Sequence, residues 1–149
     1  MLFWLCAVLV VFAYAGYPAL MFLYSQVRPK PIAKSPWLPT VTVVMSIYNG
    51  EALAAAKLVN LLELDYPSEL LDIVVMCDGC TDGTADACRL SGGQRVTVLE
   101  SSERRGKARG LDDAVAAATG EILLMTDVRQ RIELPALREL VNNFSDGSV

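Results

Sequence analysis

The feature that most constrains this fold is an uncharged apolar stretch at the start of the chain. Between Met1 and Tyr24, only Gly16 and Pro18 fall outside the hydrophobic residue types. As an α-helix this stretch spans about 36 Å, which is enough to cross a hydrocarbon layer of roughly 30 Å. The alternative, a buried helix of the globular part, fits poorly because the stretch has no polar face. The sequence therefore predicts one transmembrane helix over residues 1–24.

The flanks of this stretch favour a retained anchor over a cleaved signal peptide. A signal peptide carries basic residues before an apolar run of about 7–15 residues, whereas here a longer apolar run begins at Met1. Arg28, Lys30 and Lys34 follow the stretch, and no basic residue precedes it. The positive-inside rule then places the rest of the chain in the cytoplasm, at a cell inner membrane or plasma membrane.

A proline-rich segment follows the predicted anchor. Residues 28–39 contain four prolines, which disfavours a helix and favours a stiff, extended chain. We expect a linker over residues 25–39 and one globular domain over residues 40–149. A domain of this size has a modest hydrophobic core.

Composition excludes several kinds of site. The chain contains no histidine, so a His-based catalytic triad and a His-containing zinc site within it are excluded. Its formal net charge is −4, and no broad basic stripe is present. We therefore expect no nucleic-acid partner.

After residue 40, apolar β-branched segments alternate with helix-like segments. The predicted strands cover residues 41–47, 72–76, 96–99 and 121–126, and the predicted helices cover residues 51–64, 84–90, 107–118 and 135–144. Near-continuous apolar strands separated by helices are typical of βαβ units. The sequence predicts an α/β fold with a mostly parallel, doubly wound, Rossmann-like sheet flanked by helices.

Polar side chains follow the carboxyl ends of these strands, where ligands bind in such sheets. They belong to Ser46, Tyr48, Asn49, Asp78 and Asp127. Asp78 is suited either to bonding a nucleoside base or ribose, or to capping the helix that follows. Asp127 is suited either to binding a divalent ion that bridges phosphates, or to closing a turn. Both pairs of alternatives stay open at this point.

Four basic side chains lie in residues 104–109, at the start of the predicted helix 107–118. The positive end of a helix disfavours cations unless an anion joins them. One interpretation is a phosphate or diphosphate bound by N–H groups of the turn and by Lys107; the other is an exposed, charged surface turn. The segment is not a Walker P-loop, because Ala108 stands where that motif has Ser or Thr.

The turn after the second predicted strand contains the pair Cys77 and Cys80. Without histidine or a second such pair, zinc binding is disfavoured, and a pair of reduced thiols is favoured over a redox site. In the same turn, Asp82 fits an Asx turn or a cap for the helix that begins near Thr84.

Six short segments of the chain, taken together, form one pattern with a characteristic order and spacing. They are residues 42–51 (TVVMSIYNGE), 65–67 (DYP), 72–84 (DIVVMCDGCTDGT), 105–111 (RGKARGL), 118–127 (ATGEILLMTD) and 134–140 (LPALREL). Together they resemble the N-terminal half of a family 2 inverting glycosyltransferase of the GT-A fold. An anchor followed by a cytoplasmic domain is similar to enzymes that build exopolysaccharides or glycolipids at the inner face of a membrane.

This resemblance implies a nucleotide-sugar donor, usually UDP-linked, bound with Mg²⁺ or Mn²⁺ at the strand ends. It also implies a saccharide or lipid-linked acceptor. The donor-binding residues that it implies are Ser46, Tyr48, Asn49, Glu51, Asp78, Gly106 and Lys107. Asp127 matches the first acid of the family's DxD metal motif.

The chain departs from the family pattern at three places. Arg129 stands where the second DxD acid is expected, and is itself able to pair with a diphosphate. Cys77 replaces a frequent Asp, and the chain ends at Val149, before the part that in the family supplies the acceptor site and the general base. We expect the donor-binding half of a hexosyl- or N-acetylhexosaminyltransferase, inactive by itself. The alternative is a catalytically inactive, membrane-anchored remnant that binds nucleotide sugars.

Overall fold

The computed structural model describes residues 1–29 and 33–147, in two compact units. The units are Met1–Ala33 and Lys34–Val149. Residues 30–32 of the predicted linker, with Lys30 among them, lie outside the described residues, as do residues 148–149 of the predicted domain.

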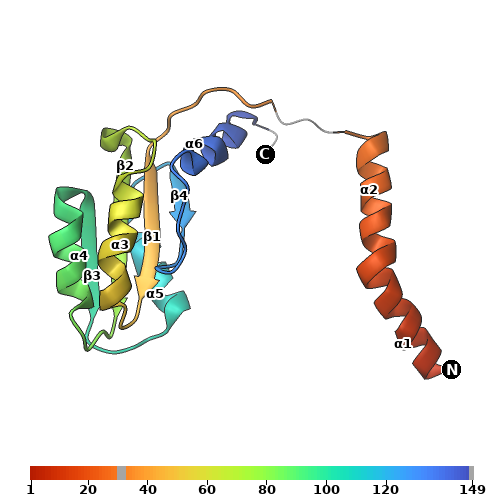
Figure 1. Ribbon diagram of the computed structural model, residues 1–149, viewed down its shortest axis with the longest axis horizontal. Coiled ribbons are helices and arrows are strands. Elements are labelled where there is room, and N and C mark those ends of the chain that lie inside the picture. Colours follow the sequence, from red (N-terminus) through yellow and green to blue (C-terminus); the bar gives the residue numbers. More distant parts are fainter. Residues whose placement is uncertain (30–32, 148–149) are drawn as a thin grey trace. The chain divides into compact units, whose positions relative to one another are not determined.

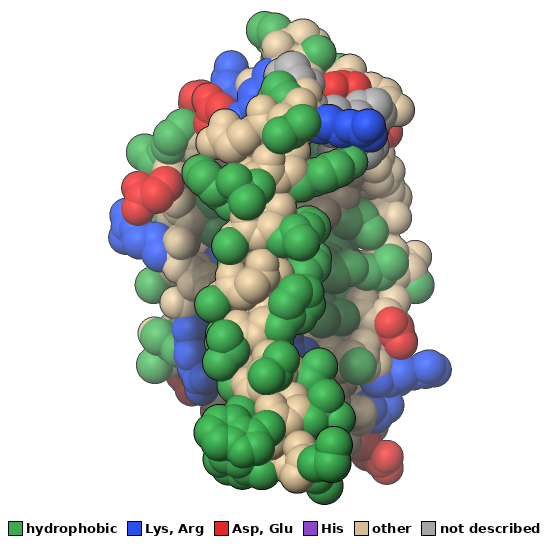
Figure 2. Space-filling model, turned by 90° about the vertical axis from the view of Figure 1, so that its right-hand side faces the viewer, with side chains coloured by type: hydrophobic (Ala, Val, Ile, Leu, Met, Phe, Trp, Pro, Cys, Tyr) green, Lys and Arg blue, Asp and Glu red, His purple; other side chains and the backbone are tan. Residues whose placement is uncertain are grey.

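The first unit is built on a continuous apolar helix, Leu2–Val27 (Figure 1). It consists of α1 (Leu2–Val11), a π-helical turn (Phe12–Gly16) and α2 (Tyr17–Val27). Hydrophobic side chains follow it along its length in Figure 2. By length and composition this helix is a candidate membrane span. The helix predicted over residues 1–24 is present and extends three residues further.

The π-helical turn ends two residues before Pro18. Proline has no N–H for the carbonyl four residues earlier, and its ring crowds that carbonyl. Here the N–H of Tyr17 instead donates to the carbonyl of Phe12, five residues back. The wider turn lets the helix continue through the proline.

The second unit contains a parallel sheet. Within the described residues its strands are β1 (Val41–Ile47), β2 (Leu71–Asp78), β3 (Val96–Ser101) and β4 (Ile122–Met125), in the order β3-β2-β1-β4. All three pairings are parallel. The chain crosses from one edge of the sheet to the other between β3 and β4, so the strand order reverses at β1. The predicted parallel, doubly wound α/β sheet is confirmed.

Helices lie on both faces of this sheet (Figure 1). They are α3 (Glu51–Leu62), α4 (Thr84–Gly92), α5 (Lys107–Ala116) and α6 (Ala136–Val141), with 3-10 turns at Ser68–Leu70, Gly93–Arg95 and Asn142–Ser145. The predicted elements are confirmed to within a few residues at their ends. The last predicted helix, 135–144, is shorter because it tightens into the final 3-10 turn.

Two hydrophobic layers hold the helices on the sheet. On one face, alternate residues of β1 and β2 pack against α3, α4 and α6, and the fully buried members include Met45, Ile47, Leu58, Leu61 and Leu137. On the other face, α5 packs against the sheet through Val44, Val74, Met76 and Ala114. Each fully buried aliphatic side chain contributes about 1.5–3 kcal/mol. The first layer contains most of this burial and stabilises the domain most.

The end of the proline-rich segment is hydrogen-bonded to the domain. The N–H of Ser35 donates to Oγ of Ser145 at 2.9 Å, and the hydroxyl of Tyr66 donates to the carbonyl of Pro39 at 2.7 Å. Residues 35–39 therefore follow the surface of the domain.

Gly120 permits the close approach of β1 and the segment that leads into β4. A Cβ at this position would lie 2.5 Å from the backbone nitrogen of Thr42 and 2.8 Å from the carbonyl carbon of Val41. Backbone atoms of a central strand cannot move aside without loss of pairing. We expect Gly120→Ala to lower the free energy of unfolding by about 1–3 kcal/mol, measured by denaturant unfolding of the full chain in detergent, followed by circular dichroism.

The matched control for this prediction is Gly147→Ala, because a Cβ at Gly147 meets nothing within 4 Å. We expect its unfolding curve to match that of the original chain. Equal stability of the two variants would contradict the packing argument.

Candidate functional site

A cleft of about 300 Å³ opens near the carboxyl ends of β1, β2 and β4. It is lined by Ser46, Ile47, Tyr48, Asp78, Arg104, Lys107, Asp127, Val128 and Arg129. Six of these residues were predicted from the sequence as site residues: Ser46, Tyr48, Asp78, Lys107, Asp127 and Arg129. The fold thus brings together side chains that lie far apart along the chain.

Asp78 orders the basic loop beside the cleft. It ends β2 and is 2% exposed. Its Oδ1 accepts the N–H of Arg105 at 2.8 Å, and its Oδ2 accepts the N–H of Gly106 at 2.7 Å. A buried carboxylate needs such charge-assisted bonds to offset its lost hydration. Gly106, with a φ of 93°, has the backbone conformation that glycine adopts without strain.

Tyr48 and Arg104 form one wall of the cleft. The guanidinium carbon of Arg104 lies 4.0 Å from the ring centroid of Tyr48, within cation–π range. Gly79 makes this approach possible, because a Cβ there would lie 2.4 Å from the backbone nitrogen of Arg104. Tyr48 stays 43% exposed. An aromatic ring and a guanidinium group in this arrangement are able to stack on a planar base.

Lys107 and Asp127 meet in the cleft. The Lys107 Nζ donates to Oδ2 of Asp127 at 2.7 Å, and the N–H of Arg129 donates to Oδ1 at 3.1 Å. The bond from Lys107, followed by that from Arg129, lowers the pKa of the Asp127 carboxyl below its usual value. Arg105, in contrast, pairs with Asp113 of α5. The basic residues that line the cleft are Arg104, Lys107 and Arg129. Their positive charge suits an anionic ligand such as a diphosphate.

Asp127 is the candidate metal ligand. No group of three or more His, Cys, Asp or Glu side chains that could hold a metal occurs within residues 1–29 and 33–147. Arg129 stands at the position where the resemblance leads us to expect a second carboxylate. Mg²⁺ is commonly bound by one or two carboxylates together with water and phosphate oxygens. The donor set therefore fits a divalent ion that arrives with a diphosphate, with Asp127 as its protein ligand.

Asn49 and Glu51 lie beside the cleft and support its loops. Oδ1 of Asn49 accepts the N–H of Thr81 at 2.9 Å, and Oε2 of Glu51 accepts the N–H of Gly83 at 3.0 Å. These bonds tie the turn after β1 to the turn after β2. Asn49 has a φ of 46°, a conformation that Asn adopts more readily than most residues. The donor-binding role predicted for these two side chains stays a prediction.

The turn after β2 confirms the structural role predicted for Asp82. Its Oδ1 accepts the N–H of Thr84 at 3.1 Å, which forms an Asx turn at the start of α4. The bond from the Thr84 hydroxyl, above all, lowers the pKa of the Asp82 carboxyl.

The cysteines of this region are free thiols. A hydrogen bond with Cys88, together with burial, raises the pKa of the Cys77 thiol, and burial raises the pKa of the Cys80 thiol. Thiolates, which redox and metal chemistry require, are thereby disfavoured. The expectation of reduced thiols stays a prediction.

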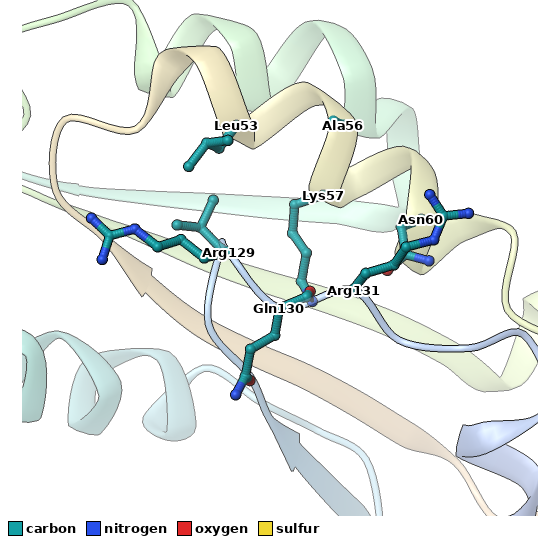
Figure 3. A pocket seen from close by; sticks show the side chains of 8 residues that line it. Leu53, Ala56, Lys57, Asn60, Arg129, Gln130 and Arg131 are labelled. Carbon is teal, nitrogen blue, oxygen red and sulfur yellow. Dashed lines mark hydrogen bonds between the residues drawn. The ribbon is translucent and has the colours of Figure 1, made fainter.

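Sequence reasoning placed Arg104 in the basic segment 104–109 without its contact to Tyr48, and it missed Lys57 and Asn60 on α3. Figure 3 shows Lys57 reaching from α3 toward the loop after β4. A signal was present, because Lys57 is the sole charged residue between Glu51 and Glu63. A lone charge within an apolar helix indicates a specific partner.

Comparison with known proteins relates this chain to one family. Residues 42–149 match the family described as Glycosyl transferase family 2. Glycosyltransferase AglD of Haloferax volcanii is 32% identical over 113 residues, which are 72% of this chain and 18% of AglD. Poly-beta-1,6-N-acetyl-D-glucosamine synthase of Staphylococcus aureus is 25% identical over 120 residues, which are 80% of this chain and 29% of the synthase.

Solved structures show the same fold. Mannosyltransferase PcManGT from Pyrobaculum calidifontis, in complex with GDP-Man and Mn²⁺, superposes with a TM-score of 0.80 at 34% identity, over 96% of this chain and 44% of that one. S. aureus TarS 1-349 in complex with UDP-GlcNAc, at 23% identity, shares the fold with a TM-score of 0.65 over 68% of this chain and 30% of TarS. The chain spans less than half the length of each of these proteins.

The two bonds to Asp78 give a test of its role. In Asp78→Asn, one acceptor oxygen becomes an NH₂ group that faces a backbone N–H, and a buried donor without an acceptor costs about 1–3 kcal/mol. We expect the free energy of unfolding to fall by about that amount and the amides of Arg105 and Gly106 to exchange faster. Hydrogen–deuterium exchange measures this, with the exposed Asp112→Asn as control. Unchanged exchange at both amides would rule out the proposed anchoring.

The ion pair of Lys107 and Asp127 predicts a change in titration. Because the folded state lowers the pKa of Asp127, its ionised form contributes stability above the unfolded-state pKa, and this stability is lost as pH falls through the folded-state pKa. In Lys107→Met we expect the Asp127 pKa to rise toward its usual value. The stability that Asp127 loses on acidification should then be smaller, and its loss should be complete at a higher pH. Carboxyl-carbon NMR titration measures the pKa.

The control for the titration is Lys34→Met, which removes an exposed lysine outside the cleft. An Asp127 pKa that is the same in both variants would show that Lys107 does not cause the shift.

Proposed function

Since the chain belongs to glycosyl transferase family 2, we propose that it forms the donor-binding part of a membrane-anchored glycosyltransferase. The enzyme transfers a hexosyl or N-acetylhexosaminyl group from a nucleotide-diphosphate-sugar to a saccharide or lipid-linked acceptor. The observation that carries this proposal is the convergence of Tyr48, Asp78, Lys107 and Asp127 on one cleft at the point where the strand order reverses.

The nucleoside part of the donor is assigned to the β1 and β2 side of the cleft. Tyr48, with Arg104 against its ring, offers a stacking surface for the base. Each carboxylate oxygen of Asp78 bonds one backbone N–H and keeps further acceptor capacity for a base N–H or a ribose hydroxyl.

The diphosphate is assigned to the opposite side of the cleft. Lys107 and Arg129 are cations beside Asp127, and Arg129 offers donors in a planar fork that matches phosphate oxygens. When the sugar leaves the diphosphate, these cations stabilise the negative charge that develops on the leaving group. Asp127 would hold a divalent ion, which would supply Lewis-acid stabilisation of the leaving group when bound. The cleft residues are assigned donor binding and leaving-group stabilisation, and none of them is assigned as the general base.

Two of the similar structures carry donors of the proposed class. PcManGT is in complex with GDP-Man, and TarS 1-349 is in complex with UDP-GlcNAc. The two donors share a nucleoside diphosphate and differ in base and sugar. Their common chemistry supports the donor class, and we expect a UDP-linked sugar as the first candidate.

The membrane location rests on the apolar helix. Leu2–Val27 is long and apolar enough to span a bilayer, and basic residues follow it, beginning with Arg28. The positive-inside rule supports a cytoplasmic domain joined to the anchor through residues 25–39. The acceptor then meets the donor at the cytoplasmic face of the membrane.

A second candidate function is donor binding without transfer. Arg129 in place of the second DxD acid favours it, because a two-carboxylate metal site cannot form at this position. Release of sugar from a donor by the full-length enzyme would exclude this candidate.

Nucleotide binding to the full chain in detergent tests the donor site. We expect calorimetric titration to show binding of UDP or GDP in the presence of Mg²⁺ or Mn²⁺. We expect Lys107→Met to weaken diphosphate binding about 10- to 100-fold, because a hydrogen bond to a charged group contributes about 1.5–3 kcal/mol. Lys34→Met, outside the cleft, serves as control and should bind like the original chain. A folded chain that binds neither nucleotide would refute the proposed function.

A further inference from the structure

A buried ammonium group lies at the base of the loop that follows β4. Lys57 of α3 is 3% exposed. Its Nζ donates to Oγ1 of Thr126 at 3.0 Å and to the carbonyl of Gln130 at 2.6 Å. In Figure 3 the Lys57 side chain runs from α3 to the loop and ends beside Gln130. The two acceptors lie on either side of residues 127–129, the part of the loop that enters the cleft.

The next turn of α3 holds the same loop at a third point. Nδ2 of Asn60 donates to the carbonyl of Ile132 at 2.8 Å, and the N–H of Ile132 donates to Oδ1 of Asn60 at 2.9 Å. Within the loop, the N–H of Gln130 donates to the carbonyl of Asp127 at 3.1 Å. Two side chains of one helix therefore fix the loop on both sides of its tight turn.

The energetics of Lys57 favour a role beyond stability. A buried cation loses its hydration, which costs several kcal/mol before hydrogen bonds offset it. This burial lowers the pKa of Lys57, and the charge of Asp127 only partly opposes the shift. An aliphatic side chain would fill the same space without that cost, as Leu58 and Leu61 do nearby. A buried polar group of this kind more readily specifies one conformation than adds stability.

Packing alone does not fix the loop. A hollow of about 160 Å³ lies between α3 and the loop, lined by Leu53, Ala56, Lys57, Asn60 and residues 128–131. Val128 and Arg129 border both this hollow and the cleft. The loop therefore has room to move away from the cleft toward α3, and the bonds from Lys57 oppose this movement.

We propose that Lys57 is a positioning residue that holds residues 126–130 so that Asp127 and Arg129 face the diphosphate of the donor. This inference rests on the proposed function of the cleft. Lys57 does not touch the donor and acts through the loop. The base-binding side, with Tyr48 and Asp78, is carried by β1 and β2 and does not depend on Lys57.

The inference predicts a selective loss of diphosphate recognition. In Lys57→Met, a variant of similar length without donors, we expect the dissociation constant for UDP to rise about 10- to 100-fold, the usual effect of removing a bond behind a ligand group. The dissociation constant for UMP should change much less. The ratio of the dissociation constant for UMP to that for UDP, called the ratio below, should therefore fall. We also expect faster amide exchange at residues 128–130 of the ligand-free chain. Calorimetry and hydrogen–deuterium exchange on the full chain in detergent measure these quantities.

Two further variants separate positioning from general stability. Thr126→Val removes one acceptor of Lys57 at nearly constant volume, so we expect the ratio to fall by a smaller factor than in Lys57→Met. This variant tests the inference even if Lys57→Met does not fold. Leu61→Ala removes a fully buried side chain one turn further along the same helix, and this side chain makes none of the bonds to the loop. It should lower the unfolding temperature and leave the ratio unchanged.

The outcomes are distinguishable. A lower ratio in Lys57→Met or Thr126→Val, with the ratio of Leu61→Ala unchanged, supports the inference. An unchanged ratio in the folded variants, with only the unfolding temperature lowered, overturns it and leaves donor binding intact. If the original chain binds neither UDP nor GDP, the proposed function fails, and the inference fails with it.

Discussion

The parallel pairing of β1 with both β2 and β4 is the constraint on which the site depends. β1 is buried along most of its length, and its register sets Ile47 opposite Cys77 and Val44 opposite Met125. A slip by one residue would turn every side chain of the strand to the opposite face. The hydrophobic layers therefore fix the register, and the register brings the ends of three strands to one edge. The polar side chains at these strand ends converge because the hydrophobic core allows only one register of β1 with β2 and β4.

Each loop at this edge is then held by a polar side chain from a neighbouring element. Asp78 of β2 bonds the turn before α5, Asn49 bonds the turn after β2, and Lys57 of α3 bonds the loop after β4. Loops carry few packing contacts of their own, so such bonds determine where their side chains point. A cleft whose groups are already in place binds its ligand with a smaller loss of conformational entropy. In the proposed reaction, the same fixed charges would act on the leaving group without further reorganisation.

The sequence predicted the sheet and most of the cleft because both leave local signals. Apolar strands ended at Ser46, Asp78 and Asp127, and parallel strand ends share one edge. The partners of those residues left no local signal. The bonds from Asp78 to the loop 27 residues later, and from Lys57 to residues 126–130, depend on how separate elements pack. Asn49 and Glu51 match the expected motif, but their bonds to the turn after β2 could not be predicted from it. These bonds also depend on how the two loops pack.

In the proposed function, Arg129 would change how this cleft neutralises the diphosphate of the donor. A site with two carboxylates repels phosphate until a divalent ion binds, because each acid adds negative charge. Here Asp127 is already paired with Lys107, Asp78 accepts two backbone N–H groups, and Arg129 and Arg104 add positive charge to the lining. The cleft is therefore attractive to a diphosphate before any ion arrives, and an ion that binds Asp127 must share its carboxylate with Lys107. Donor binding in this chain should accordingly depend less on a divalent ion than donor binding at a two-carboxylate site.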